Sequence, residues 1–155
     1  MNFIKRLLGG FFEAAGILLV AVIVVVVFAQ VLARYVFHYP LPWGEEVVRF
    51  AFVYLIFVGA VVGMKNRAHL NIDFLLVALP PRARRLLNLL VNVLVAVFLG
   101  FVIVQGVKFV RMSGTQGTPY LQIPMSYAYA VIPFGALAML YYLVRQTVEL
   151  LKSGK

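Results

Sequence analysis

The sequence QVLARYVFHYPLPWGEEVVR occupies residues 30–49 and separates the first two apolar stretches of the chain. It holds two arginines, two adjacent glutamates and the only tryptophan of a protein in which 12% of residues are charged. Pro42 suits the first turn of a new helix. The segment therefore predicts a turn between two helices. Its charges belong at a membrane surface, because they are costly within the hydrocarbon.

Long apolar runs on both sides of this segment indicate a membrane protein. The chain is 64% hydrophobic with a mean hydropathy of +1.00, whereas soluble domains carry about 25% charged residues. Four runs lack Asp, Glu, Lys and Arg, namely residues 14–33, 50–64, 86–107 and 112–144. The first of them is too long for the apolar part of a cleavable signal peptide.

A spanning helix needs roughly 20 mostly apolar residues. The second run reaches that length when its helix starts near Trp43, and the fourth must include a loop. We therefore predict an all-α integral membrane protein with a single domain over residues 1–155. Its four transmembrane helices are expected at about 11–37, 43–64, 84–107 and 124–145. Within them, the Gly59/Gly63 spacing permits close helix approach, and Pro133 predicts a kink.

The distribution of basic residues predicts the orientation. Ten of the fourteen Lys and Arg residues flank the termini and the middle loop. By the positive-inside rule, both termini and that loop are cytoplasmic. Segments 34–49 and 108–122 then face outward.

The middle loop contains an apolar stretch that is too short to cross the membrane. We predict that residues 71–79 form an interfacial arm helix along the inner surface. Asn71 suits its N-cap, and Pro80 ends it. The arm and its lipid anchors are predicted to include His69, Asp73, Arg82, Arg84 and Arg85.

The adjacent glutamates of the opening segment point about 100° apart on a helix, so they form no shared-proton pair. Glu45 and Arg49 are four residues apart and can form an ion pair. Two interpretations stay open: a helix entrance stabilised by charge, or a contact site for a partner protein. For Arg34, the alternatives are an ion pair with the start of the second helix and, together with Gln30, a contact to a neighbouring subunit.

Enzymatic and metal chemistry lack the residues they require. The chain has no cysteine, and by the predicted topology His38 and His69 lie on opposite sides of the membrane. We find no catalytic set, no metal-ligand spacing and no nucleotide signature, so we expect no enzyme activity and no cofactor. The net charge of +9 is expected to meet lipid headgroups, not nucleic acid.

Two other functions remain as alternatives. A homo-oligomeric channel or small exporter would need polar residues lining a pore, and Asn88, Asn92 and Gln105 are the candidates in the third helix. A membrane-embedded lipid enzyme would need clustered acids, for which Glu45 and Glu46 come nearest.

The order of several residues resembles the small membrane subunit of TRAP transporters, the DctQ-like proteins. The residues that carry this resemblance are Gln30, Arg34-Tyr35, Pro42-Trp43-Gly44-Glu45-Glu46, Arg49, Gly59, His69, Asp73, Leu79-Pro80 and Ile132-Pro133-x-Gly135.

The resemblance implies one component of a tripartite uptake system in a bacterial inner membrane. A periplasmic binding protein would deliver a small organic acid to a large permease subunit, which binds substrate and sodium ions. The small subunit would be a scaffold for the large one. Its expected interface or docking residues are Gln30, Arg34, Tyr35, Trp43, Glu45, Glu46 and Arg49.

Overall fold

Four long helices make up most of the described structure. The computed structural model describes residues 2–66 and 81–152. Its helices are α1 (Asn2–Tyr35), α2 (Pro42–Lys65), α4 (Pro81–Met112) and α5 (Met125–Lys152), and the 3-10 turn η1 (Ser113–Thr115) follows α4. Each of the four helices contains a segment long and apolar enough to cross a membrane. The predicted four-helix membrane architecture is confirmed.

Three of the helices extend well beyond a predicted end, whereas α2 exceeds its predicted bounds by one residue at each end. α1 begins at Asn2, α4 extends to Met112 and α5 extends to Lys152. The predicted bounds stopped near the first charges, but Lys, Arg and Glu are good helix formers. Helical hydrogen bonding therefore continues past the end of the apolar run. The predicted arm at 71–79 lies outside the described residues.

α1 ends at Tyr35, two residues before the predicted end, and a left-handed residue follows in the turn. His38 has a φ of 54°, and the Tyr39 N–H donates to the Ala33 carbonyl at 3.0 Å. This bond reaches back six positions and satisfies one of the carbonyls left free at the C-terminus of the helix. The chain then enters α2 at Pro42, as predicted.

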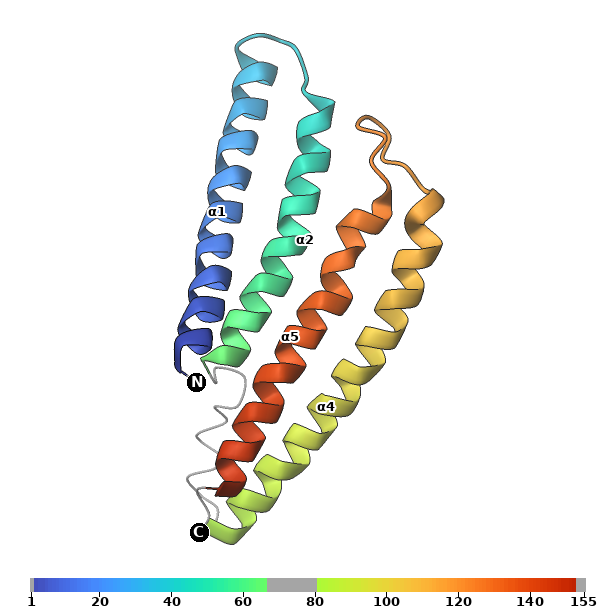
Figure 1. Ribbon diagram of the computed structural model, residues 1–155. Coiled ribbons are helices and arrows are strands. Elements are labelled where there is room, and N and C mark those ends of the chain that lie inside the picture. Colours follow the sequence, from blue (N-terminus) through green and yellow to red (C-terminus); the bar gives the residue numbers. More distant parts are fainter. Residues whose placement is uncertain (1, 67–80, 153–155) are drawn as a thin grey trace.

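The helices lie side by side in the order α1, α2, α5, α4 (Figure 1). Both connections at residues 36–41 and 113–124 lie at one end of the molecule, which we call the loop end. The chain termini lie toward the other end, the terminal end. α2 and α5 both begin at the loop end and therefore run parallel. Their contact joins the α1–α2 hairpin to the α4–α5 hairpin.

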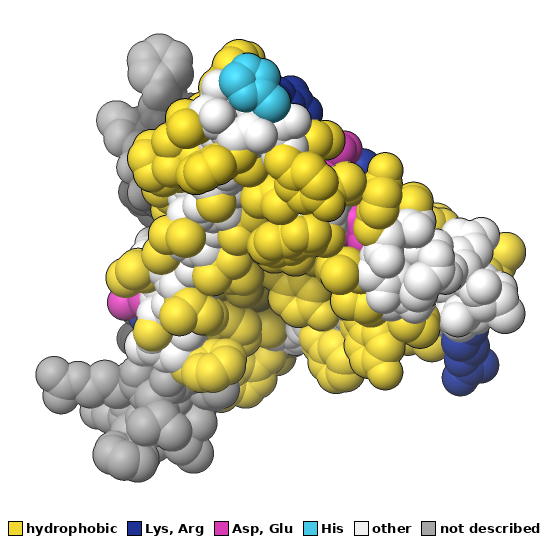
Figure 2. Space-filling view, turned by 90° about the horizontal axis from the view of Figure 1, so that it is seen from above, with side chains coloured by type: hydrophobic (Ala, Val, Ile, Leu, Met, Phe, Trp, Pro, Cys, Tyr) yellow, Lys and Arg dark blue, Asp and Glu magenta, His cyan; other side chains and the backbone are white. Residues whose placement is uncertain are grey.

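The buried core is small and lies among α2, α4 and α5. Its fully or nearly buried members are Val61, Met64, Leu99, Ala136, Met139, Tyr142 and Leu143. The spanning segment of α1, by contrast, has none of its window residues buried. Seen from above, apolar side chains cover much of the visible surface (Figure 2). Such a surface suits lipid and other membrane helices.

Two glycines allow close contact between neighbouring helices. A Cβ atom on Gly135 of α5 would lie 2.9 Å from Cδ1 of Phe57 on α2. A Cβ on Gly106 of α4 would lie 3.1 Å from Ile132 on α5. Gly59 has open space where its Cβ would be, so no helix of the described chain uses it for close packing. α5 continues as one helix through Pro133.

We predict that Gly135→Ala destabilises the protein by about 1–3 kcal/mol, because the added methyl group overlaps Phe57. Thermal unfolding in detergent measures the change. Gly100→Ala is the matched control, since a Cβ at Gly100 meets nothing within 4 Å and alanine favours a helix over glycine. A Gly135→Ala protein as stable as the wild type would show that α2 and α5 do not depend on this close contact.

Candidate functional site

The residues predicted to form an interface gather at the loop end of α1 and α2. Tyr35 closes α1 and is 73% exposed, and Trp43 lies in the first turn of α2 with 44% of its surface exposed. Gln30 packs against Gly44, where an added Cβ would lie 3.0 Å from the Gln30 side chain. The Gln30 amide also donates to the Leu41 carbonyl at 3.5 Å. This packing holds the two helices together beside the turn.

The two adjacent glutamates have different surroundings, as their helical spacing predicts. The Arg49 guanidinium donates to Glu45 Oε1 at 3.3 Å, which confirms the predicted pair. Both side chains are largely exposed, so this ion pair contributes little to stability. The Glu46 side chain turns away from this pair and is buried, with 5% of its surface exposed.

The buried carboxylate of Glu46 accepts hydrogen bonds from another part of the chain. The Tyr120 N–H donates to Glu46 Oε1 at 2.8 Å, and the Leu121 N–H donates to Oε2 at 3.0 Å. Successive backbone N–H groups that converge on an anion form a natural carboxylate site. Hydrogen bonds to an ionised group are stronger than neutral ones. Glu46 thus connects the start of α2 to the loop before α5.

Hydrogen bonds within the loop at residues 116–124 hold its backbone in the conformation that binds Glu46. The Thr118 N–H donates to the Ile123 carbonyl at 3.0 Å, and the Thr118 hydroxyl accepts from the Ile123 N–H at 3.2 Å. Gln122 has a φ of 53°, which reverses the chain. Within the loop, the Thr118 side chain is buried, whereas the Tyr120 side chain is exposed. The backbone amides therefore face Glu46 while the Tyr120 side chain faces outward.

Arg34 lies beside Glu45 without bonding to it. Both residues line a hollow of about 370 Å³ with Val27, Gln30, Val31 and Tyr35. The predicted proximity of Arg34 to the start of the second helix is thus confirmed. Within the described ranges, however, Arg34 forms no ion pair. The intramolecular salt bridge is therefore the interpretation that the geometry does not support, and a contact outside the chain stays a prediction.

Three further polar contacts between helices were not predicted. The Tyr54 hydroxyl donates to the Tyr127 carbonyl at 2.7 Å, and the Gln146 amide donates to the Met64 carbonyl at 2.6 Å. Both join α2 to α5, one nearer the loop end and the other at the terminal end. Asn92 of α4 donates to the Thr147 hydroxyl of α5 at 2.9 Å. Tyr54 and Asn92 are polar side chains within apolar stretches, whereas Gln146 and Thr147 follow Arg145, and none of their spacings in the sequence indicates these partners.

The described residues offer no arrangement suited to metal binding. No group of three or more His, Asp or Glu side chains among them has a geometry that would hold an ion. The two candidate acids of a lipid enzyme are also separated, since Glu45 pairs with Arg49 and Glu46 binds backbone amides. Arg82, Arg84 and Arg85 belong to the first turn and a half of α4. His69 and Asp73 lie outside the described residues.

We predict that Glu46→Ala releases the loop at residues 116–124. The Tyr120 and Leu121 amides, bonded to the carboxylate in the wild type, then exchange with deuterium faster. Hydrogen–deuterium exchange read by mass spectrometry measures this change. Glu45→Ala is the matched control because it removes the neighbouring carboxylate, which makes no bond to this loop. Equal exchange rates in both variants would contradict the role of Glu46.

Comparison with known proteins identifies the family to which this sequence belongs. The family described as "Tripartite ATP-independent periplasmic transporters, DctQ component" matches residues 23–153. The sialic acid TRAP transporter small permease protein SiaQ of Vibrio cholerae is 26% identical over 98% of this chain and 88% of its own length. That relative is therefore similar in size as well as in sequence.

Two other relatives are much longer than this chain. The sialic acid TRAP transporter permease protein SiaT of Haemophilus influenzae is 30% identical over 90% of the chain, which spans 23% of that protein. The isethionate TRAP transporter permease protein DctMQ of Oleidesulfovibrio alaskensis is 31% identical over 83% of the chain and 21% of its own length.

The family match extends from the second half of α1 through α5 and takes in both hairpins. This chain therefore belongs to the DctQ family, the small permease component of TRAP transporters.

Proposed function

We propose that this chain is a scaffold subunit that braces a large permease subunit and does not itself bind the transported substrate. One observation carries the proposal: three buried polar side chains of the described helices each bond to another part of the same chain, although the buried Tyr142 hydroxyl has no partner there. Glu46 binds a loop, Asn92 binds Thr147, and Gln146 binds a carbonyl of α2. A carrier instead places polar groups toward a substrate site near mid-membrane.

The relatives suggest what the complete transporter would do. The three relatives described above are named for sialic acid and isethionate, which are small organic acids. The transporter would import such an acid together with sodium ions, both bound by the large subunit. A periplasmic binding protein would deliver the substrate. The two longer relatives support a large membrane partner, because DctMQ carries the small permease region within a longer permease protein.

The orientation follows from charge. The loop end would face the periplasm of a bacterial inner membrane, because ten of the fourteen Lys and Arg residues flank the termini and the middle loop in the sequence, and not the connections at the loop end. The block formed by Arg34, Trp43, Glu45 and Arg49 would then lie at the periplasmic surface. There it is placed for contact with the large subunit or the binding protein. The predicted lipid contacts of Arg82, Arg84 and Arg85 would lie on the cytoplasmic side.

The observed contacts argue against the channel alternative. Asn92 is 2% exposed and donates to a hydroxyl of α5. It therefore lines no path along this chain. The helices form one layer in the order α1, α2, α5, α4, which encloses no pore by itself. Ion flux through vesicles containing only this protein would support the channel and contradict the scaffold.

We expect co-expression with a large TRAP permease to yield a stable complex in detergent. Vesicles that contain both subunits should take up the organic acid when the binding protein and sodium are supplied. Vesicles that contain only this chain should take up none, because it has no substrate site. A chain that never co-purifies with a large permease would contradict the scaffold role.

We also predict that Arg34→Ala and Glu46→Ala each lower uptake in cells severalfold. Arg34→Ala removes a cation available to a partner, and Glu46→Ala releases the loop at residues 116–124. Lys108→Ala is the control, since it removes an exposed cation near the loop end of α4. Initial uptake rates at matched protein levels give the answer. Wild-type rates in both variants would mean that this block does not serve the transporter.

A further inference from the structure

One face of α1 is exposed along its length beside α2. Its side chains follow alternating steps of three and four residues, which place them on one stripe. The stripe comprises Glu13, Ile17, Val20, Val24, Val27, Val31 and Arg34. At 1.5 Å per residue it is about 30 Å long, which is the thickness of the hydrocarbon core. A partner that follows this stripe would cross the whole membrane.

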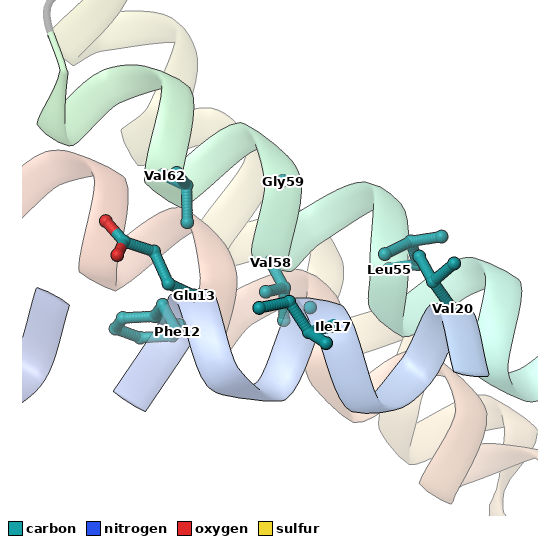
Figure 3. Close-up of a pocket in the computed structure, with 9 residues that line it drawn as sticks. Phe12, Glu13, Ile17, Val20, Leu55, Val58, Gly59 and Val62 are labelled. Atoms are coloured by element: carbon teal, nitrogen blue, oxygen red, sulfur yellow. The ribbon is translucent and has the colours of Figure 1, made fainter. Parts of the chain in front are cut away.

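Two hollows show that the stripe borders a groove between α1 and α2. The hollow toward the terminal end measures about 530 Å³, and Figure 3 shows Phe12, Ile17 and Val20 of α1 with Leu55 and Val58 of α2 around it. The hollow at the loop end is the one lined by Arg34 and Glu45. We call the stripe with these two hollows the α1–α2 groove.

The floor of the α1–α2 groove includes two glycines, one of which the described chain does not use for packing. Gly16 and Gly59 both line the hollow toward the terminal end. A Cβ on Gly59 would meet nothing within 4 Å. In membranes, helices associate where small residues let a neighbouring backbone approach closely. The open space above Gly59 therefore suits a helix from outside the chain.

The charged side chains at the two ends of the groove differ in whether they have a partner within the described chain. At the terminal end, the Lys65 ammonium donates to Glu13 at 2.6 Å. At the loop end, Glu45 is paired with Arg49, whereas Arg34 has no partner among the described residues. A guanidinium at the edge of the membrane is best satisfied by a carboxylate, which it binds with two parallel bonds. The groove therefore lacks an acid at this one position.

The exposed face of α4 has a different chemistry. Its hollow is lined by one helix alone, through Leu86, Leu89, Leu90, Val93, Leu94, Val97 and Phe98. These side chains are all apolar and none is small. None of its described lining side chains is charged. Such a surface suits lipid tails, and it serves as the comparison for the α1–α2 groove.

We propose that the α1–α2 groove receives one transmembrane helix of the large permease subunit, with an acidic side chain placed against Arg34. The proposal rests on the scaffold role and adds the face on which the partner binds. The occupant is a helix because the groove is about as long as the membrane is thick, includes a glycine with open space above it, and ends at an arginine that has no partner among the described residues. A lipid in the groove is the competing outcome.

Site-specific photo-crosslinking within the complete complex tests the face. A benzophenone amino acid replaces Val20 or Val27 in the groove, and Val93 or Val97 on α4 as controls. Illumination should give an adduct with the mass of both subunits from the groove positions only. Adducts with lipid at Val20 and Val27, or subunit adducts only from α4, would overturn the proposal. Because the complex is purified first, its absence would count against the scaffold role instead.

Filling the groove provides a second measurement. Gly59→Leu should lower the amount of large subunit recovered with this chain roughly tenfold, because the leucine occupies the space meant for the partner helix. Gly100→Leu on α4 is the matched control, since both glycines have open space at the Cβ position. Thermal unfolding of each variant alone verifies that it folds. Equal recovery of the partner with both folded variants would overturn the proposal.

The charge requirement has its own test. Arg34→Glu should weaken the complex more than Arg34→Gln, because it places a second acid against the one expected on the partner. Replacing that partner acid by lysine should restore recovery with Arg34→Glu. If no acidic residue of the large subunit near the crosslinked site restores recovery in this way, the proposed pairing is wrong.

Discussion

The hydrogen bonds between the Glu46 carboxylate and two backbone amides, those of Tyr120 and Leu121, join the two halves of this protein. Apolar side chains gain nothing by leaving lipid for each other, so helix pairs in a membrane depend on close packing and polar contacts. Among the described helices, α2 and α5 form the main contact between the α1–α2 and α4–α5 hairpins. Glu46 connects them at the loop end, and Gln146 connects them at the terminal end through the Met64 carbonyl.

Because polar contacts at both ends hold α2 to α5, these two helices form the centre of the layer, and α1 and α4 lie at its edges. Between them, Gly135 lets α2 and α5 approach closely against Phe57. α4 closes one edge with a surface of leucine, valine and phenylalanine. α1 forms the other edge, with a groove that ends at an unpaired arginine. A scaffold needs this division, because it must keep its own shape while it offers a surface to a partner.

Comparison of sequence and structure shows why some residues were interpreted correctly and others not. The Glu45–Arg49 pair follows from local helix geometry, since residues four apart meet on any helix. Glu46 is one residue away, but its partners are 74 and 75 residues further along the chain. No spacing in the sequence indicates such a contact. The Gly59/Gly63 pattern predicted a close helix approach, but a Cβ at Gly59 would meet nothing within the described chain, whereas Gly44, Gly106 and Gly135 each lie close to a neighbouring helix.

The sequence by itself determined the membrane class, the four helices and the turn at residues 36–41. These depend on local properties: apolar length, the helical period and the fixed φ of proline. Only the tertiary structure decided the order of the helices, the parallel contact of α2 with α5 and the burial of Glu46. Those features depend on which residues meet across the layer, and in an apolar environment a few isolated polar side chains and glycines select that pairing. The segment at 30–49 thus shows both cases. Its own residues determine its turn, whereas the role of its Glu46 carboxylate depends on a loop more than 70 residues further along the chain.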